Sequence, residues 1–202
     1  MTRPPARMGG VGHGGRRGAR RGIIDCQCHL YPPDLLDLME RRRSDPRLYR
    51  RGGERYVRMG AWHRRIFSHH SDPDALLARM DACGIAVAAL SINDPGPEWF
   101  GRDAASVARA ANDFIGEVVR RRPDRFFGLG VLPLPDRRAA EREFERCAGR
   151  LGMKGFLLYT NLAGRFPDEP AFRWLFAAAE ARRLPLLLHP AKPLTCGLVS
   201  DY

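Results

Sequence analysis

The chain has 202 residues, of which 44% are hydrophobic, and it carries a formal net charge of +11. This length suits a single domain, and the apolar content can supply its core. The sequence has no run of about eighteen apolar residues, so we expect no membrane-spanning helix. Six arginines and no acidic residue lie in residues 1–22, so more than half of the excess positive charge belongs to this segment.

The same segment is rich in glycine and arginine and has very few apolar side chains. Such a composition cannot offset the entropy lost on ordering, so we expect a disordered tail over residues 1–22. The folded domain is expected over residues 23–202. Five cysteines, an odd number, follow no secretory hydrophobic segment, which favours reduced thiols and a cytoplasmic location.

In the first part of the domain, short apolar runs alternate with helical repeats. Residues 23–28 predict a strand, and a short helix is expected around residues 34–42. Residues 44–70 show no clear period, so we interpret them as a long excursion over the strand ends, where long loops are often functional. In residues 71–84, a capping residue and a proline precede apolar residues at helical spacing, and Gly84 ends the predicted helix.

The alternation continues through the rest of the chain. Strands are expected at residues 85–92, 126–132, 155–159 and 184–188, and helices at residues 103–122, 136–151 and 170–183. The last three strands recur about every 28 residues, which is typical of consecutive βα units with right-handed crossovers and a parallel sheet. The pattern therefore predicts an α/β fold with the rhythm of a βα-barrel, in which about five units are present.

Two of the expected strands end in a histidine that is soon followed by proline. His29 closes the first strand ahead of Pro32 and Pro33, and His189 closes the last strand ahead of Pro190. The carboxyl ends of parallel strands converge on one face of an α/β fold, where metals and substrates are held. The two histidines therefore predict a metal site.

Side-chain alternation along the first strand refines this prediction. Successive strand residues point to opposite faces, so Asp25, Gln27 and His29 are expected on one side. Cys26 and Cys28 are expected on the other side, which disfavours a zinc knuckle that would combine both cysteines with His29. The polar set remains the candidate for metal binding.

Several separate stretches carry a family resemblance through their order and spacing. They are Ile24-Asp25-x-x-x-His29-x-x-Pro32, Arg79-Met80-Asp81-x-x-Gly84-Ile85, Asn112-Asp113, Arg122-Pro123-Asp124-Arg125-Phe126, Leu132-Pro133-Leu134, Leu151-Gly152-Met153-Lys154-Gly155, Thr160-Asn161-x-x-Gly164 and Leu186-Leu187-Leu188-His189-Pro190. With them, residues 24–202 resemble the first part of an amidohydrolase-related protein, in the subgroup that includes aminocarboxymuconate-semialdehyde decarboxylase.

This resemblance implies a distorted (β/α)8 barrel with one catalytic divalent metal, usually zinc, at the carboxyl ends of its strands. Members of the family hydrolyse C–N or C–O bonds or remove carboxylate groups without oxidation. The implied fold for this chain is a partial metal-dependent hydrolase barrel in which strands six to eight are missing. The resemblance also implies a truncated product, because the family's later functional histidine and aspartate follow strands six and eight.

Carried over by position, the resemblance places the family's metal ligands on Gln27, His29 and His189. The family generally has His-x-His, or Glu-x-His in some decarboxylases, so Gln27 is a departure. Its neutral carbonyl oxygen is a weaker ligand for a zinc-like ion than imidazole or carboxylate. No complete catalytic set is expected in this chain.

Asn161 and Arg64 are the candidates for substrate contact. Asn161 lies in a stretch that could equally form a turn. Arg64 lies in the expected excursion, where it could meet the carboxylate of a substrate. The implied substrate is therefore a small molecule with a carboxylate or carbonyl group. We also expect a homodimer, although no particular residue of the sequence carries this expectation.

Three classes of function stay open. The first is a metal-dependent hydrolase or non-oxidative decarboxylase, and the sequence does not choose between these reactions. The second is an inactive fragment without a complete metal site, because a five-strand arc leaves its first and fifth strands as open edges. The third is an arginine-rich nucleic-acid-binding protein. It is the remotest, because the arginine clusters at residues 41–43 and 120–122 fall in predicted helices, where solvated charge is ordinary.

Overall fold

The computed structural model describes residues 22–191. The disordered tail predicted for residues 1–22 lies outside the described residues, apart from Gly22. In the described part of the chain, none of the helices combines the length and the hydrophobicity that crossing a bilayer requires.

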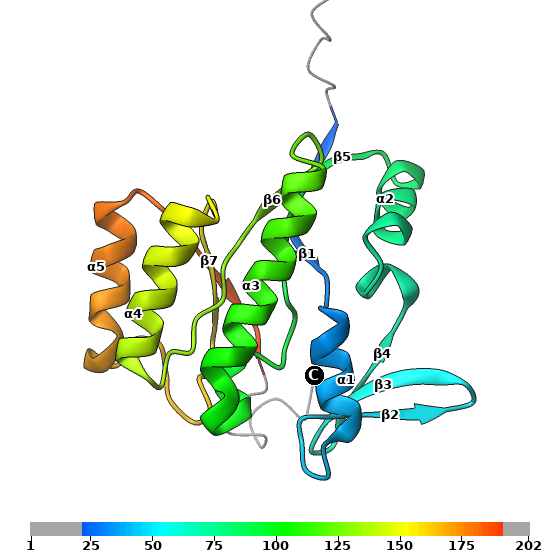
Figure 1. The fold of residues 1–202 in the computed structure, drawn as a ribbon, viewed down its shortest axis with the longest axis horizontal. Coiled ribbons are helices and arrows are strands. Elements are labelled where there is room, and N and C mark those ends of the chain that lie inside the picture. The colour runs from blue at the N-terminus through cyan, green and yellow to red at the C-terminus, as the bar shows by residue number, and fades with distance from the viewer. Residues whose placement is uncertain (1–21, 192–202) are drawn as a thin grey trace, which may run out of the picture.

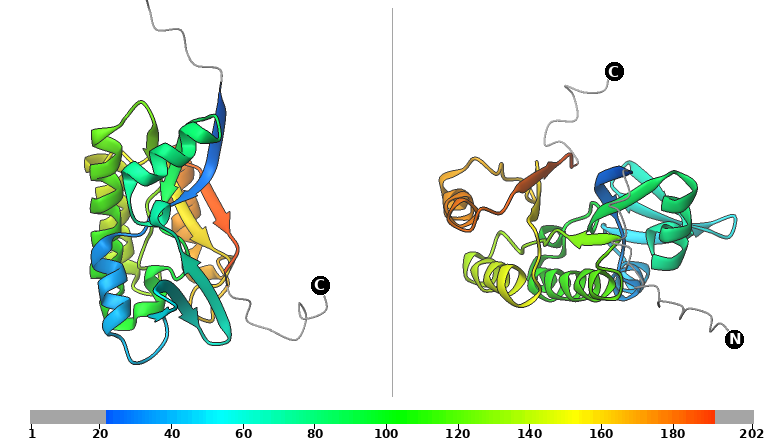
Figure 2. Two further views of the ribbon diagram at one scale, coloured as in Figure 1. Left: turned by 90° about the vertical axis from the view of Figure 1, so that its right-hand side faces the viewer. Right: turned by 90° about the horizontal axis from the view of Figure 1, so that it is seen from above.

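The centre of the fold is a curved row of five parallel strands (Figures 1 and 2). The strands are β1 (Ile23–His29), β5 (Ile85–Ser91), β6 (Phe126–Gly128), β7 (Phe156–Tyr159) and β8 (Leu186–His189). β1 pairs with β5, β5 with β6, and β7 with β8. A parallel bridge between Gly130 and Phe156 joins the two groups. Neighbours in space therefore follow chain order, as consecutive βα units predict.

In the described part of the chain, five α-helices pack along the outer side of this row, with α3 and α4 in front of the strands and α5 at one end of the row (Figures 1 and 2). They are α1 (Pro33–Arg41), α2 (Pro73–Ala82), α3 (Ala104–Arg121), α4 (Arg137–Glu145) and α5 (Arg173–Ala181). Shorter helical segments are η1 (Ser68–His70), η2 (Pro97–Asp103), η3 (Arg146–Arg150) and η4 (Pro170–Phe172). The predicted alternation of strands and helices is confirmed. The helix expected over residues 136–151 instead passes from α4 into the wider π-helical turn η3.

Residues 44–70 do not form the irregular excursion that their sequence predicted, and this expectation was wrong. They contain an antiparallel sheet of β2 (Arg47–Arg51), β3 (Glu54–Met59) and β4 (Trp62–Ile66). Leu48, Val57, Met59 and Ile66 are its buried apolar residues. Arginines occupy many of the intervening positions, and their long stems are partly buried. Because arginine counts as polar in a sequence pattern, the alternation of buried and exposed residues along these strands could not be recognised from the sequence.

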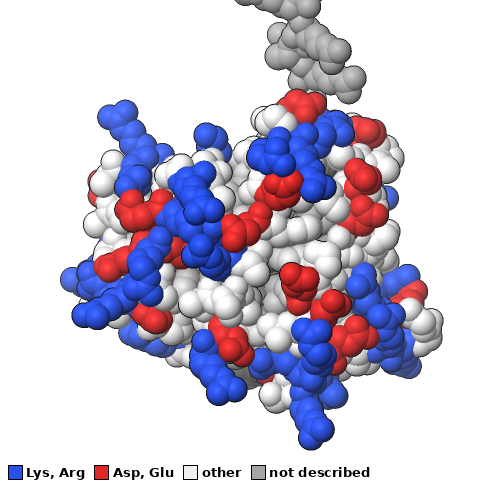
Figure 3. Space-filling view, viewed as in Figure 1, with Lys and Arg blue, Asp and Glu red and all other residues white. Residues whose placement is uncertain are grey.

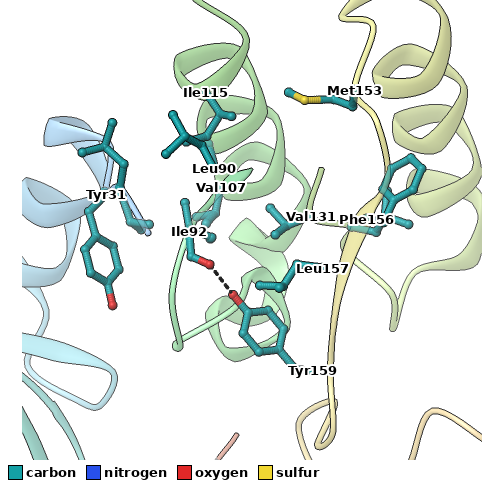
Figure 4. Close-up of a cluster of buried hydrophobic side chains, with 14 of the residues drawn as sticks. Tyr31, Leu90, Ile92, Val107, Ile115, Val131, Met153, Phe156, Leu157 and Tyr159 are labelled. Carbon is teal, nitrogen blue, oxygen red and sulfur yellow. Dashed lines mark hydrogen bonds between the residues drawn. The ribbon is translucent and has the colours of Figure 1, made fainter. Parts of the chain in front are cut away.

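The core lies between the strand row and the helices. One apolar stripe of α3 faces this core, where Val107, Ala111, Ile115 and Val118 are buried and Phe114 is half-buried. Figure 4 shows Ile115 of α3 beside Leu90 of β5. This packing fixes the outer helices against the strands whose carboxyl ends carry the candidate site.

A side chain replaces strand pairing just after β6. The strand was expected to run to Leu132, but it ends at Gly128. The Val131 N–H donates to Asn112 Oδ1 at 2.9 Å, and Asn112 Nδ2 donates to the Val131 carbonyl at 2.9 Å. Because the Asn112 side chain satisfies both backbone groups, Val131 needs no neighbouring strand there.

The arginines of the visible surface are mixed with acidic side chains (Figure 3). In the predicted helical cluster at residues 120–122, Arg120 and Arg121 both pair with Glu117 at 2.8 Å. This pairing agrees with the interpretation of the cluster as ordinary solvated charge.

Candidate metal centre

Two imidazole rings meet where the first and last strands of the row end. Their Nε2 atoms, on His29 and His189, lie 3.1 Å apart. β1 and β8 are the two ends of the row, so only the curvature of the whole row brings these rings together. The predicted convergence of the two histidines is thus present in the fold.

The opposite edge of each ring is held by a neighbouring polar group. His189 Nδ1 lies 2.6 Å from the Pro190 carbonyl, an acceptor that requires the Nδ1 atom to carry the proton. The His189 Nε2 atom therefore presents its lone pair. His29 Nδ1 contacts Ser91 Oγ at 3.3 Å. Such contacts orient the rings of metal-binding histidines through the nitrogen that does not bind the metal.

Burial keeps both imidazoles neutral near pH 7. Together with the charges of His189, Arg64 and His70, it lowers the pKa of His29 to about 3. Burial also lowers the pKa of His189, and Arg64 adds to this effect. Neutral imidazole is the form that binds metal ions.

The geometry of the pair fits one divalent ion. Two nitrogens that each lie about 2.1 Å from a shared ion at tetrahedral or octahedral angles are roughly 3.0–3.4 Å apart. The Nε2–Nε2 distance of 3.1 Å falls in this range. Among residues 22–191, however, no group of three or more His, Cys, Asp or Glu side chains is arranged to hold a metal. The described chain thus offers two imidazoles and would need further ligands.

The alternation predicted for β1 is interrupted before it reaches His29. Asp25 pairs with Ala88 and Cys28 with Leu90, so three steps along β1 face two steps along β5. Such an extra residue is a β-bulge, which breaks the regular alternation of faces. The expectation that one polar face runs unbroken from Asp25 to His29 was therefore wrong. Gln27 lies in the bulge and is exposed, and its backbone N–H donates to Asp25 Oδ1 at 2.9 Å.

Arg64 is brought to the histidine pair by the antiparallel sheet. It lies on β4 and donates hydrogen bonds to the Tyr31 hydroxyl and to the Asp94 carbonyl. Its guanidinium also lies 5.0 Å from the centre of the Trp62 ring. The Arg64 charge lowers the pKa of both histidines. An anion entering beside the rings would meet this cation.

Asn161 has a clear part in the backbone turn after β7. Its side chain is buried, and Oδ1 accepts a hydrogen bond from the Gly164 N–H at 2.8 Å. Gly164 has a φ of 98°, which favours glycine at this position. These features match the turn interpretation, while substrate contact by Asn161 stays a prediction.

Sequence reasoning missed two buried acids, one of which contacts Arg64 through its backbone carbonyl. Asp94 and Glu98 follow β5 and are only 3% and 5% exposed. Burial raises the pKa of Asp94 to about 6 and that of Glu98 to about 8. The sequence signal that could have identified them is the position of Asp94 soon after the strongly apolar strand β5. The strand row brings that position to the same face as the histidines.

Comparison with known proteins places this geometry in context. The sequence model of a family described as Amidohydrolase matches residues 24–199. Gamma-resorcylate decarboxylase from Rhizobium radiobacter is 38% identical over 129 residues, which cover 60% of this chain and 39% of that protein. The chain therefore spans about two fifths of the length of this curated relative.

Two solved structures resemble the described fold. The apo form of IDCase from Metarhizium anisopliae aligns with a TM-score of 0.81 and 22% identity, over 90% of this chain and 53% of that one. At that identity the likeness concerns the fold. The 5-carboxyvanillate decarboxylase of Novosphingobium aromaticivorans, complexed with manganese and 4-hydroxy-3-methoxy-5-nitrobenzoic acid, aligns with a TM-score of 0.60 and 32% identity. This alignment covers 66% of this chain and 39% of that one.

Proposed function

Because the chain belongs to the amidohydrolase family, we propose that it supplies the histidine pair and the anion-binding arginine of a metal-dependent, non-oxidative decarboxylase. Family membership confirms the resemblance found in the motifs. Together with the curved row of parallel strands, it also confirms the predicted partial (β/α)8 barrel. Hydrolysis, the other reaction left open by the sequence, has less support, because the relatives compared above with at least 30% identity are decarboxylases.

One observation carries the proposal, namely the approach of His29 Nε2 to His189 Nε2 at 3.1 Å. These two nitrogens would hold a divalent ion, with Gln27 as a weaker third candidate. A bound ion would supply a positive charge that orients a carboxylate or acidifies a water molecule. Zinc was the metal predicted from the family resemblance, while a related decarboxylase contains manganese, so both ions need testing.

Arg64 would position the substrate. Its hydrogen bonds to Tyr31 and to the Asp94 carbonyl fix the guanidinium before any ligand arrives. A fixed guanidinium can pair with a carboxylate at little further cost in side-chain entropy. The proposed substrate is therefore a small carboxylic acid. Removal of carbon dioxide leaves a carbanionic carbon that must gain a proton, so the chemistry also needs a proton donor near this face.

Metal binding by the purified chain tests the histidine pair directly. We expect Zn²⁺ or Mn²⁺ to bind at one equivalent in calorimetry, and His29→Ala or His189→Ala to weaken binding at least tenfold. His63→Ala is the matched control, because His63 is exposed on β4 and contacts Tyr49 Oη at 2.9 Å. Equal binding by all four proteins would show that the ion sits elsewhere.

An inactive fragment is the second candidate function. It is favoured by the lack of a third His, Cys, Asp or Glu ligand beside the pair within residues 22–191. Carbon dioxide release from 2,6-dihydroxybenzoate in the presence of Mn²⁺ distinguishes the two candidates. Metal binding without any release, across a panel of hydroxybenzoates, would favour the inactive fragment.

A further inference from the structure

Asp94 and Glu98, called the acid pair below, are two buried acids placed on either side of Gly96, and Arg64 donates a hydrogen bond to the Asp94 carbonyl. Asp94 follows β5, and Glu98 lies in η2. Within the described structure, Asp94 Oδ1 and Glu98 Oε1 are buried and have no hydrogen-bond partner. No ion pair within 4.0 Å joins either carboxyl to a basic side chain in residues 22–191. Each carboxyl keeps a backbone hydrogen bond, Asp94 with Gly96 and Glu98 with its own N–H, so one oxygen of each is left without a partner. Such buried oxygens are rare, because the desolvation of a carboxylate is costly.

The packing around Gly96 keeps the Glu98 carboxyl in place. A Cβ atom built on Gly96 would lie 2.5 Å from Glu98 Oε2 and 2.3 Å from Tyr159 Cε2. Only glycine therefore lets the Glu98 carboxyl and the Tyr159 ring approach the backbone here. The Tyr159 ring in turn lies 5.6 Å from the His189 ring, measured between centroids. The acid pair thus lies in the layer directly behind the candidate metal centre.

The charged and titratable side chains that interact with the pair come from several elements. Arg64 faces Asp94 from β4, Tyr159 faces both acids from β7, and Tyr31 lies between Arg64 and the Asp94 carbonyl. His29, His70 and His189 feel the same Arg64 charge from the other side. Their pKa values lie below the usual value for histidine. Arg64 is the cation of this group that faces Asp94.

We propose that Asp94 and Glu98 share one proton and act as positioning residues for Arg64. In this arrangement, the single negative charge of the pair balances the partly buried guanidinium while no substrate is present. When a substrate carboxylate binds Arg64, a second anion comes close to the pair. The pair then takes up a proton from solvent, because two neighbouring buried charges of one sign repel each other. This inference rests on the proposed function, since it assumes that Arg64 receives a carboxylate.

The pKa directions agree with this arrangement. Burial and the Asp94 charge together raise the pKa of Glu98 to about 8, against the effect of a backbone hydrogen bond. Burial also raises the pKa of Asp94, to about 6, although the Arg64 charge acts against this. At pH 7 the pair would therefore carry one negative charge. An anion bound to Arg64 would offset the effect of the Arg64 charge on the Asp94 carboxylate. The pair would then bind a second proton more readily.

Binding of benzoate to the metal-loaded chain measures the linked proton. We expect the wild-type affinity to fall between pH 6 and pH 8, by up to roughly tenfold per pH unit, which is the limit for one linked proton. Calorimetry in two buffers of different ionisation enthalpy should show net proton uptake. Asp94→Asn should remove both effects while leaving the Asp94 carbonyl in place for Arg64.

Infrared spectroscopy tests the shared proton without any ligand. We expect the carbonyl band of a protonated carboxylic acid at pH 7, and we expect Glu98→Gln to remove it. Glu117→Gln is the matched control, because Glu117 is held by Arg120 and Arg121 and has a pKa lowered to about 2. Circular dichroism of Glu98→Gln, and of Asp94→Asn as a second variant, shows whether the protein stays folded. Loss of the band can then be distinguished from loss of the fold.

The outcomes separate this inference from the proposed function. Absence of a Glu98-dependent acid band overturns the shared proton, whatever benzoate does. A band together with pH-independent benzoate binding overturns the positioning role. Failure of benzoate to bind while the band is present overturns the carboxylate substrate and supports the acid pair alone.

Discussion

A single polar side chain, that of Asn112, holds the backbone in place just after the end of β6. Asn112 on α3 is 1% exposed and bonds both backbone groups of Val131 and the Glu143 carboxylate. The same carboxylate accepts hydrogen bonds from Arg146. This residue was singled out in the sequence only because of a family motif. The structure gives the physical reason, which is that its amide replaces a missing strand partner.

Replacing Asn112 by alanine should destabilise the protein by about 2–4 kcal/mol. The change leaves the buried Val131 N–H and one Glu143 oxygen with fewer partners, and each such loss costs about 1–3 kcal/mol. The free energy of unfolding in urea is the appropriate measurement. Ser106→Ala, at an exposed position of the same helix, serves as the control. A difference between the two variants below about 1 kcal/mol would contradict this account.

At the scale of elements, the β2–β3–β4 sheet is the feature that the sequence pattern concealed. Its first turn consists of Gly52 and Gly53, with φ angles of 58° and 81°. Arg51 and Glu54 pair directly across this two-residue turn. Glycine pairs of this kind suit the tight turns of β-hairpins. The sheet matters for function, because β4 carries Arg64 to the histidine pair.

Gly53→Ala should destabilise the protein by about 1 kcal/mol, because alanine is strained at positive φ. No atom lies within 4 Å of a Cβ built at Gly53, so the cost would come from the backbone alone. Gly149→Ala is the matched control, since that site is equally open and has no positive φ. Thermal unfolding followed by circular dichroism compares them. Equal midpoints would argue against a strained turn.

At the scale of the molecule, the row of strands has two outer members that expose apolar side chains. Ile23 and Ile24 on β1 are 60% and 61% exposed, and Leu188 on β8 is 56% exposed. In residues 22–191, β1 pairs with β5 alone, and β8 pairs with β7 alone. Exposed apolar strand edges promote association with other chains. The predicted homodimer stays untested, but these residues mark where association would occur.

We therefore expect the isolated chain to self-associate at micromolar concentration. The double variant Ile24→Lys and Leu188→Lys should shift the population toward monomer, because charged residues on edge strands oppose pairing. Sedimentation velocity over a concentration series measures this shift. Phe176→Lys, on the exposed face of α5, is the control. An unchanged distribution in the edge variant would place the contact elsewhere.

The sequence by itself determined the strand and helix alternation and the two histidines at strand ends. These features follow from local periodicity and from turn residues, which depend on neighbours along the chain. The β-bulge at Gln27 and the antiparallel sheet could not be predicted in this way. In the first case the register of β1 is set by β5, and in the second arginine stems mask the alternation.

Tertiary structure decided how closely the two predicted histidines approach and which further groups share the site with them. His29 and His189 stand 160 positions apart in the sequence, and only the curvature of the strand row brings their Nε2 atoms together. Arg64 lies on β4, whose position depends on its pairing with β3 and on the pairing of β3 with β2. In the sequence, nothing distinguishes Asp94 and Glu98 from solvent-exposed acids, whereas in the fold both are buried and their pKa values are raised. Local pattern therefore specifies the elements, while long-range packing determines the charge, protonation and spacing of the site.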